Sequence, residues 1–261
     1  MADAALMSAY DGVSVDALST RMHSASVFAF ASLGSTLDEA HTLAANGAPA
    51  GTVIVADEQT AGRGRVGRSW TSRAGGGVWC TVIERPTDAR VLELLSLRVG
   101  LALAPLLEAL GASPVSLKWP NDLFVDGGKV AGVLTEARWQ GSRAEWVAIG
   151  VGINVVPPGD GGDGPGAALD APRHRVLEAA VQAIRAAAAT TGLLTEGERA
   201  EYGSRDLAAG RTLSEPLSGI AAGVAPDGSL LVRTPAGEER VRAGSLRFAD
   251  EPATRDATCS S

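Results

Sequence analysis

"KWPNDLFVDGGKVAGVLTEA", residues 118–137, contains two apolar segments of strand length on either side of the turn signal DGGK at 126–129. Pro120 fixes its own φ angle and biases the residue before it toward extended backbone. Asn121 and Asp122 are therefore expected at a rigid strand junction. The stretch predicts a β-hairpin that carries polar and cationic side chains.

Both lysines of the chain lie within this stretch. Of the 23 basic residues, 21 are Arg, and the two Lys are Lys118 and Lys129. A compact ammonium reaches points that a planar guanidinium cannot occupy, so the lysines of an arginine-rich chain are informative. Ala131 and Gly132, just after Lys129, leave room for a ligand against the strand. We expect Lys129 at a ligand site, whereas Lys118 is most simply a strand residue whose stem lies along the surface.

Further strand and helix patterns surround the hairpin. Apolar runs of strand length lie at residues 26–30, 52–56, 77–83, 115–119 and 145–156. Helical patterns occupy residues 34–47, 91–110 and 173–189. In the first of these helices, Ser35 or Thr36 is expected as the N-cap, with Asp38 or Glu39 three residues on. These elements predict an α+β protein with a mixed β-sheet flanked by helices.

The character of the sequence changes near residue 206, where short strand patterns are separated by the turn signals PDG and PAG. We therefore expect a small C-terminal β domain beside a larger main domain. The expected divisions are a partly ordered leader at 1–25, the main domain at 26–205, the β domain at 206–250 and a flexible tail at 251–261. The glycine-rich stretch at 157–166 is expected to be a loop.

The composition excludes several classes of protein. The formal net charge is −7, so any nucleic-acid site would have to be local. The two cysteines, Cys80 and Cys259, are far apart, which argues against a disulfide framework and fits a reducing cytoplasm. The N-terminus has no pattern of a secretion signal, and the most apolar window, 92–110, contains charged residues and a proline. We expect a cytoplasmic protein without a membrane span.

A second conspicuous stretch, "QTAGRGRVGRSW" at 59–70, has several interpretations. Its glycines fit dinucleotide-binding or phosphate-loop patterns, but the residues after Gly67 have no helical period and the phosphate loop's Lys is absent. A DNA contact fits poorly, because no helix-turn-helix pattern lies beside the arginines. Two interpretations remain: a solvated loop, or a flexible lid whose Arg63, Arg65 and Arg68 close over an anionic ligand.

Four motifs occur in an order and spacing that resemble the bacterial biotin protein ligases. They are the glycine-arginine loop at 62–70, K-W-P-N-D at 118–122, G-K-x-x-G at 128–132 and G-x-G-I-N at 150–154. The "GST" at 34–36 also fits, and the resemblance covers roughly residues 26 to 248. It implies the class II synthetase-like biotin/lipoate ligase fold, in which the main domain is catalytic and binds biotin and ATP. It also implies an SH3-like β-barrel at the C-terminus.

The resemblance implies an enzyme that activates biotin with ATP to biotinyl-5'-AMP. The biotinyl group would then pass to one lysine of a biotin carboxyl carrier protein domain, in an acyl-CoA or pyruvate carboxylase. Because the first step brings a carboxylate to the α-phosphate of a nucleotide, cationic side chains and Mg²⁺ must neutralise the developing charge. The implied small molecules are biotin, ATP and Mg²⁺. We expect a monomer or weak homodimer that binds no nucleic acid and no membrane.

The resemblance also implies site residues. Biotin contacts are expected from Ser35, Thr36, Gln59, Arg63, Gly64, Arg65, Lys129, Gly132 and Gly150. Contacts to ATP and the adenylate are expected from Arg65, Arg68, Trp70, Asn121, Asp122, Lys129 and Asn154. The two catalytic candidates are Lys129, which would hold the biotin carboxylate, and Arg65, which would retain the mixed anhydride. Asp122 is the candidate ligand for the metal.

The chain departs from the family pattern at two places. Leu37 follows "ST" where the family commonly has Asn, and "GSL" at 244–246 replaces a glycine-acid-valine. Only about 25 residues precede the catalytic pattern, so we expect a single-function ligase without a DNA-binding domain. The alternatives are a lipoate or octanoate ligase of the same superfamily, or a non-catalytic regulator that responds to biotin.

Overall fold

The main body of the protein is an eight-stranded mixed β-sheet in a computed structural model that describes residues 5–86, 88, 91–158 and 166–251. In spatial order its strands are β1 (Leu6–Met7), β4 (Ser26–Leu33), β5 (Thr52–Gln59), β6 (Gly77–Glu84), β10 (Arg143–Asn154), β9 (Gly128–Gln140), β8 (Asp122–Val125) and β7 (Ser116–Lys118). β4 and β5 are parallel, and the other neighbouring pairs are antiparallel. The expected α+β class with a mixed sheet is confirmed.

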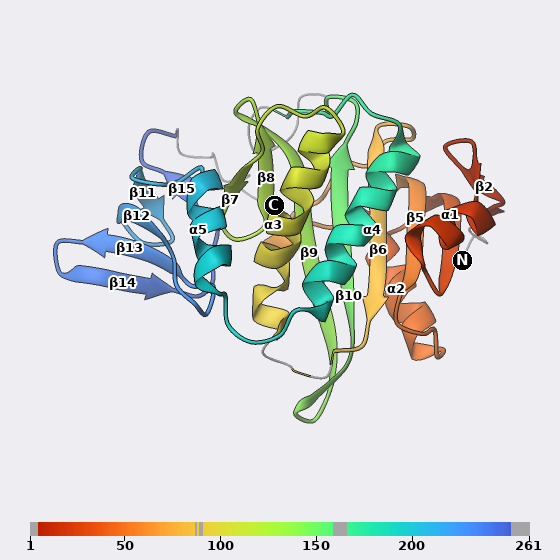
Figure 1. Cartoon of the computed structure of the whole chain (residues 1–261), viewed down its shortest axis with the longest axis horizontal. Coiled ribbons are helices and arrows are strands. Elements are labelled where there is room, and N and C mark those ends of the chain that lie inside the picture. The colour runs from red at the N-terminus through yellow and green to blue at the C-terminus, as the bar shows by residue number, and fades with distance from the viewer. Residues whose placement is uncertain (1–4, 87, 89–90, 159–165, 252–261) are drawn as a thin grey trace, which may run out of the picture.

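Helices cover both faces of this sheet (Figure 1). On one face lie α3 (Val91–Ala109) and α4 (Arg173–Ala189), and on the other lies α2 (Thr36–Ala45). The strands serve both faces because successive side chains point in opposite directions. In β5, Val53 and Val55 pack in the α3–α4 core, whereas Ile54 packs in the α2 core. Each of these side chains is fully buried, which is worth about 1.5–3 kcal/mol.

The hairpin predicted from residues 118–137 is present as β8 and β9, and it contains a bulge. Leu123 pairs with Ala131, but Phe124 pairs with Lys129, so Val130 is the extra residue in β9. Val130 is fully buried in the α3–α4 core. The extra residue shifts the alternation of the strand and places Lys129 on the opposite face, together with Gly132.

The first described residues are more ordered than a leader implies. β1 pairs with β4, β2 (Ala9–Tyr10) pairs with β3 (Val13–Ser14), and α1 (Val15–Met22) follows. The Tyr10 ring is 1% exposed, and its hydroxyl donates to the carbonyl of Gly77 at 3.3 Å. This segment therefore packs into the main sheet and its helical layer.

The C-terminal strands form a separate antiparallel sheet at the end of the molecule (Figure 1). In spatial order they are β14 (Gly237–Val241), β13 (Leu230–Thr234), β12 (Gly219–Val224), β11 (Thr212–Glu215) and β15 (Arg247–Phe248). β14 and β15 are the two ends of this strand order, so the described residues show a small antiparallel sheet, and the expected SH3-like barrel stays a prediction. The small C-terminal β module is confirmed in this coarser form. It is joined to the main body by a hydrogen bond of 3.0 Å from Trp119 Nε1 to the carbonyl of Gly228.

Two of the described helices were missed in the sequence, α1 within the expected leader and α5 (Glu196–Arg205) near the end of the expected main domain. α5 begins at Thr195 with a capping box, in which Glu198 is the reciprocal partner. Most of the expected 157–166 loop and all but the first residue of the 251–261 tail, including Cys259, lie outside the described residues. Cys80 is a free thiol in the core, and burial raises its pKa to about 12. None of the described helices combines the length and apolar character needed to cross a bilayer.

Candidate active site

The centre of the candidate site is a strip of three glycines on the α2 side of the sheet. Gly132 of β9 pairs directly with Gly152 of β10, and Gly150 lies two residues back on β10. Because these residues have no side chains, other groups approach the sheet closely here. A Cβ on Gly152 would lie 2.8 Å from the Trp70 ring, and a Cβ on Gly150 would lie 3.2 Å from Leu37. We call these three residues the glycine floor.

The Trp70 indole lies on this floor. Its Nε1 atom is buried and has no hydrogen-bond partner among the described residues. Trp79, which pairs with Gly152, meets the Trp70 ring edge-on with centroids 6.4 Å apart. The Lys129 ammonium lies 5.0 Å from the centre of the Trp70 ring on the other side. The indole therefore packs directly against Gly132 and Gly152 of the floor.

A cluster of hydroxyl and amide groups lies beside the floor, and we call it the polar node. Gln59 Oε1 accepts hydrogen bonds from the Thr36 backbone N–H at 2.8 Å and from Thr36 Oγ1 at 3.0 Å. Gln59 Nε2 donates to Ser72 Oγ at 2.8 Å, and Thr81 Oγ1 donates to Thr36 Oγ1 at 2.9 Å. Ser35 Oγ is buried next to them without a partner in the described part of the chain. A buried, unpaired hydroxyl is costly, so it marks a position where a polar ligand atom fits.

The expected N-cap of α2 is confirmed in its position but not in its hydrogen bond. Ser35 occupies the N-cap position but makes no side-chain capping bond, and the side chain of Gln59 accepts from the backbone N–H of Thr36 instead. Neither the Ser35 nor the Thr36 hydroxyl is used as a cap. The helix end is thus satisfied from a neighbouring strand, which leaves the Ser35 hydroxyl available.

Charged groups lie at the other end of the glycine floor. The Lys129 ammonium is 2.8 Å from Asp122 Oδ1. Burial lowers the pKa of the Arg65 guanidinium, whereas the charge of Asp122 raises it and that of Arg68 lowers it. Arg65 also borders a hollow of about 410 Å³ between α3 and the C-terminal module. Lys129 thus pairs directly with Asp122, and the same carboxylate acts electrostatically on Arg65, whose guanidinium donates to the Gly244 carbonyl.

The glycine-arginine loop folds back on itself. Its base is closed by bridges from Gln59 to Ser72 and from Arg63 to Ser69. The Gly64 backbone N–H donates to the Arg68 carbonyl at 2.7 Å, so this predicted biotin contact is used inside the loop. At the tip, Val66 has a φ of 55°, a left-handed conformation that is unfavourable for a β-branched residue. The tip is exposed, and the loop forms a lid over the floor rather than an isolated solvated segment.

The three lid arginines point to different partners. Arg63 Nη2 lies 3.0 Å from Asp38 Oδ1 and 2.7 Å from Glu136 Oε2. Arg65 Nη2 donates to the Gly244 carbonyl at 3.4 Å, and Arg68 Nη2 donates to Ser245 Oγ at 3.5 Å. The lid therefore contacts α2 and β9 at its base and the C-terminal module at its tip.

Two of the predicted residues stabilise the backbone around the site. Asn121 Nδ2 donates to the Val133 carbonyl at 2.9 Å. Asn154 Nδ2 donates to the carbonyls of Lys129 and Ala167, both at 3.2 Å. Asn154 Nδ2 thus uses both of its N–H groups within the chain, and Asn121 Nδ2 uses one of its two. The contacts of both residues with the nucleotide remain predictions.

Sequence reasoning missed Ser72 and Thr81, which complete the polar node. Thr81 is a fully buried hydroxyl in an otherwise apolar strand, on the same face as Trp79. A polar residue at that place in the period-two pattern was the available signal. The contact of Ser72 with Gln59 depends on how the lid folds back, which the local sequence does not reveal.

Comparison with known proteins agrees with this geometry. The biotin/lipoate A/B protein ligase family matches residues 29–154. A biotin–[acetyl-CoA-carboxylase] ligase of Paracoccus denitrificans is 32% identical over 221 residues, which cover 75% of this chain and 89% of that protein. The chain belongs to the biotin/lipoate A/B protein ligase family. The part matched by the family contains the glycine floor, the polar node and the lid.

Two further comparisons show which proteins of this family the chain resembles. The bifunctional ligase/repressor BirA of Bacillus spizizenii is 44% identical over 124 residues, 47% of this chain but only 38% of that protein. The solved structure of the Aquifex aeolicus biotin protein ligase in complex with biotin and ATP is 27% identical, with a TM-score of 0.71. That comparison covers 85% of this chain and 99% of the other. The biotin ligase fold thus extends over most of the chain.

Proposed function

We propose that this chain activates biotin with ATP and transfers the biotinyl group to a lysine of a carrier domain. The observation that carries the proposal is the floor of three glycines with an unpaired hydroxyl at one end and a lysine at the other. A flat, largely apolar molecule with a polar ring at one end and a carboxylate at the other matches a hydroxyl, an apolar floor and a lysine in that order. The names of the relatives and of the Aquifex aeolicus complex support biotin and ATP as the ligands.

In the first step, a biotin carboxylate oxygen attacks the α-phosphorus of ATP. The bond between the α-phosphorus and the bridging oxygen to the β-phosphate breaks, and pyrophosphate leaves with its electron pair. Lys129 would hold the biotin carboxylate and then the acyl-phosphate oxygens, and Arg65 would stabilise the charge that develops between them. Fixed cations of this kind are worth about 3–4 kcal/mol of transition-state stabilisation.

The polar node would bind the other end of biotin. Thr36 and Gln59 are hydrogen-bonded to each other and so are already oriented before a ligand arrives, and the buried Ser35 Oγ has no partner among the described residues. A ureido ring has both donors and an acceptor and could pair with such a set. This assignment includes Gly132 and Gly150 as the surface on which the rings and chain lie.

Mg²⁺ fits the site only as an ion carried by the nucleotide. Among the described residues, no three His, Cys, Asp or Glu side chains are placed to hold a metal. Mg²⁺ commonly binds substrate phosphates with one or two carboxylates, and Asp122 would be the carboxylate here. When bound, the ion would neutralise phosphate charge, and Asp122 would have to exchange its contact with Lys129 for it.

In the second step, the amine of a carrier lysine attacks the acyl carbon, and AMP leaves. The partner would be the biotin carboxyl carrier domain of an acyl-CoA carboxylase, with pyruvate carboxylase as the other candidate. We assign the chemistry to a catalytic unit of residues 26–205, assisted by the module of residues 206–250. The lid would retain the mixed anhydride until the carrier arrives.

The test is pyrophosphate release on mixing the chain with ATP and biotin, followed by transfer of labelled biotin to an isolated carrier domain. We expect both reactions with biotin and neither with lipoate. Reaction with lipoate alone would assign the chain to the other branch of the family. Tight biotin binding without pyrophosphate release would reduce it to a sensor.

A further inference from the structure

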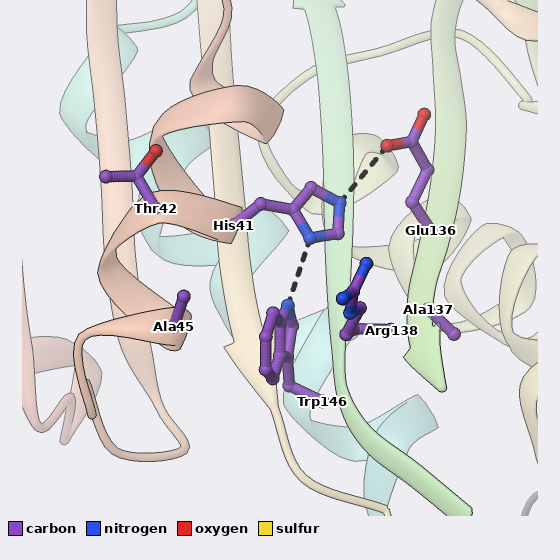
Figure 2. A pocket seen from close by; sticks show the side chains of 7 residues that line it. All are labelled: His41, Thr42, Ala45, Glu136, Ala137, Arg138 and Trp146. Carbon is purple, nitrogen blue, oxygen red and sulfur yellow. Dashed lines mark hydrogen bonds and ion pairs between the residues drawn. The ribbon is translucent and has the colours of Figure 1, made fainter. Parts of the chain in front are cut away.

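A chain of hydrogen bonds outside the glycine floor leads to the base of the lid. Trp146 Nε1 donates to His41 Nδ1 at 3.0 Å, and His41 Nε2 lies 3.1 Å from Glu136 Oε2 (Figure 2). The same Glu136 oxygen accepts from Arg63 Nη2 at 2.7 Å. These four side chains come from β10, α2, β9 and the lid. They connect three regular elements to the first arginine of an irregular loop.

The direction of each bond follows from its donors. An indole N–H can only donate, so His41 Nδ1 must be the acceptor and carries no proton. In the neutral ring, the proton then lies on Nε2 and is donated to Glu136. Glu136 Oε2 accepts from both His41 and Arg63, and an ionised carboxylate does this well because it has no donor of its own. The contacts thus define one tautomer of His41 and one orientation of Glu136.

Glu136 is held in place from both sides. It is on the same face of β9 as Gly132, four residues further along the strand. Its side chain is 31% exposed, that of His41 is 28% exposed and that of Arg63 is 37% exposed. His41 and Trp146 are also walls of an open hollow of about 710 Å³ that lies outside the floor (Figure 2). The chain of hydrogen bonds from Trp146 to Arg63 therefore supports the lid from outside the ligand site.

We propose that Glu136, oriented by His41 and Trp146, is a positioning residue that fixes Arg63 and so holds the lid closed over the glycine floor. Arg63 is bridged to Ser69 across the loop, so fixing Arg63 fixes the stem from which Arg65 projects. Asp38 adds a second carboxylate contact to Arg63 at 3.0 Å, but it is 63% exposed, and no second side chain of the described residues holds it. This inference rests on the proposed function. It adds that Glu136 sets how firmly the lid retains the biotinyl-adenylate intermediate.

The first test measures the lid itself and does not depend on activity. Glu136→Gln keeps an oxygen to accept from His41 but removes the charge that pairs with Arg63. We expect amide hydrogen exchange in residues 60–72, and tryptic cleavage after Arg65 and Arg68, to rise about fivefold. Glu239→Gln, which changes an exposed glutamate of β14, is the matched control and should leave both rates unchanged.

The second test measures release of the intermediate. Glu136→Gln should release biotinyl-adenylate into solution about fivefold faster, while the rate of pyrophosphate formation at saturating biotin and ATP stays within twofold. A role limited to general stability would slow both reactions and lower the thermal midpoint. If wild-type chain forms no adenylate, the proposed function fails, and the exchange measurement still decides the positioning role.

A variant pair at His41 provides the second line of evidence. His41→Leu removes both hydrogen bonds and should loosen the lid in the same direction as Glu136→Gln. His41→Gln restores a donor toward Glu136 and should bring lid exchange back toward the wild-type rate. The inference is overturned if Glu136→Gln and His41→Leu both leave lid exchange and adenylate release within twofold of wild type.

Discussion

The two ends of the glycine floor are built in different ways. Apart from Ser72 at the end of the loop, the polar node is built on α2, β5 and β6, and its members Ser35, Thr36 and Thr81 are at most 4% exposed. The lid end is an irregular loop with a strained, exposed tip and arginines that bond to other parts of the chain. Groups on packed strands keep their orientation without a ligand, whereas groups on a loop are oriented by whatever the loop contacts. Recognition of the uncharged ring would thus be prebuilt, and charge stabilisation would be delivered by closure.

The largest effect is expected at the strand lysine, which belongs to the prebuilt framework but acts at the charged end. Lys129→Ala should lower the rate of adenylate formation about 100- to 1000-fold, because it removes the cation that holds the carboxylate. The measurement is pyrophosphate release at saturating ATP and biotin. Lys129→Arg keeps the charge but changes its shape, and we expect little recovery. A near-normal rate for Lys129→Ala would show that another group binds the carboxylate.

A second variant tests whether the lid retains the intermediate. Arg65→Gly should speed the escape of biotinyl-adenylate about 10- to 100-fold, because a charged hydrogen-bond donor is lost. Escaped adenylate reacts with any accessible amine, so bystander proteins should become biotinylated. Labelling confined to the carrier domain would remove Arg65 from this role.

A third variant tests the polar node. Thr81→Val keeps the shape of the side chain but removes the hydroxyl that donates to Thr36. Loss of one such bond is worth about 1 kcal/mol, so biotin affinity should fall about fivefold while adenylate retention is unchanged. The matched control is Thr52→Val at the start of β5, at the opposite end of that strand from Gln59, where the hydroxyl donates to the Pro49 carbonyl. Equal affinities for the two variants would contradict a prebuilt node.

The smallest effect is expected at the tip of the lid. Val66→Asn replaces a β-branched residue at a φ of 55° with one that tolerates this conformation. Because Val66 is 79% exposed, little packing is lost, and relief of about 1 kcal/mol of strain should slow adenylate escape two- to fivefold. Leu193→Asn, at another exposed apolar residue, should have no such effect. Faster escape in Val66→Asn would mean that the strained tip is not the closed form.

The elements that follow from local hydrophobic periodicity could be predicted from the sequence. The hairpin of residues 118–137, the helices α3 and α4 and the pattern of main-sheet strands follow from local periodicity and turn residues. The bulge at Val130 could not be predicted, because an extra residue is defined only relative to the partner strand. α5 is polar and short, so its periodicity is weak, although its capping box could be seen in the sequence.

The candidate site was likewise predictable in part from the sequence. The motifs identified the residues that come together at the floor, but the pairing of Arg63 with Glu136 joins positions 73 residues apart. Ser35 is the N-cap residue of α2, as expected, but its side chain makes no capping bond, and Gln59 on β5 accepts from the Thr36 N–H instead. The roles of individual residues toward biotin and ATP remain predictions.

The position of Trp70 has one more consequence. Any molecule that settles on the three glycines lies against the indole of Trp70, so its binding changes the surroundings of that ring. The ring also contacts Trp79 and the Lys129 ammonium, and its emission should change in step with occupancy. The chain thus contains its own fluorescent probe, and a Trp70→Phe variant would identify which part of the signal belongs to it.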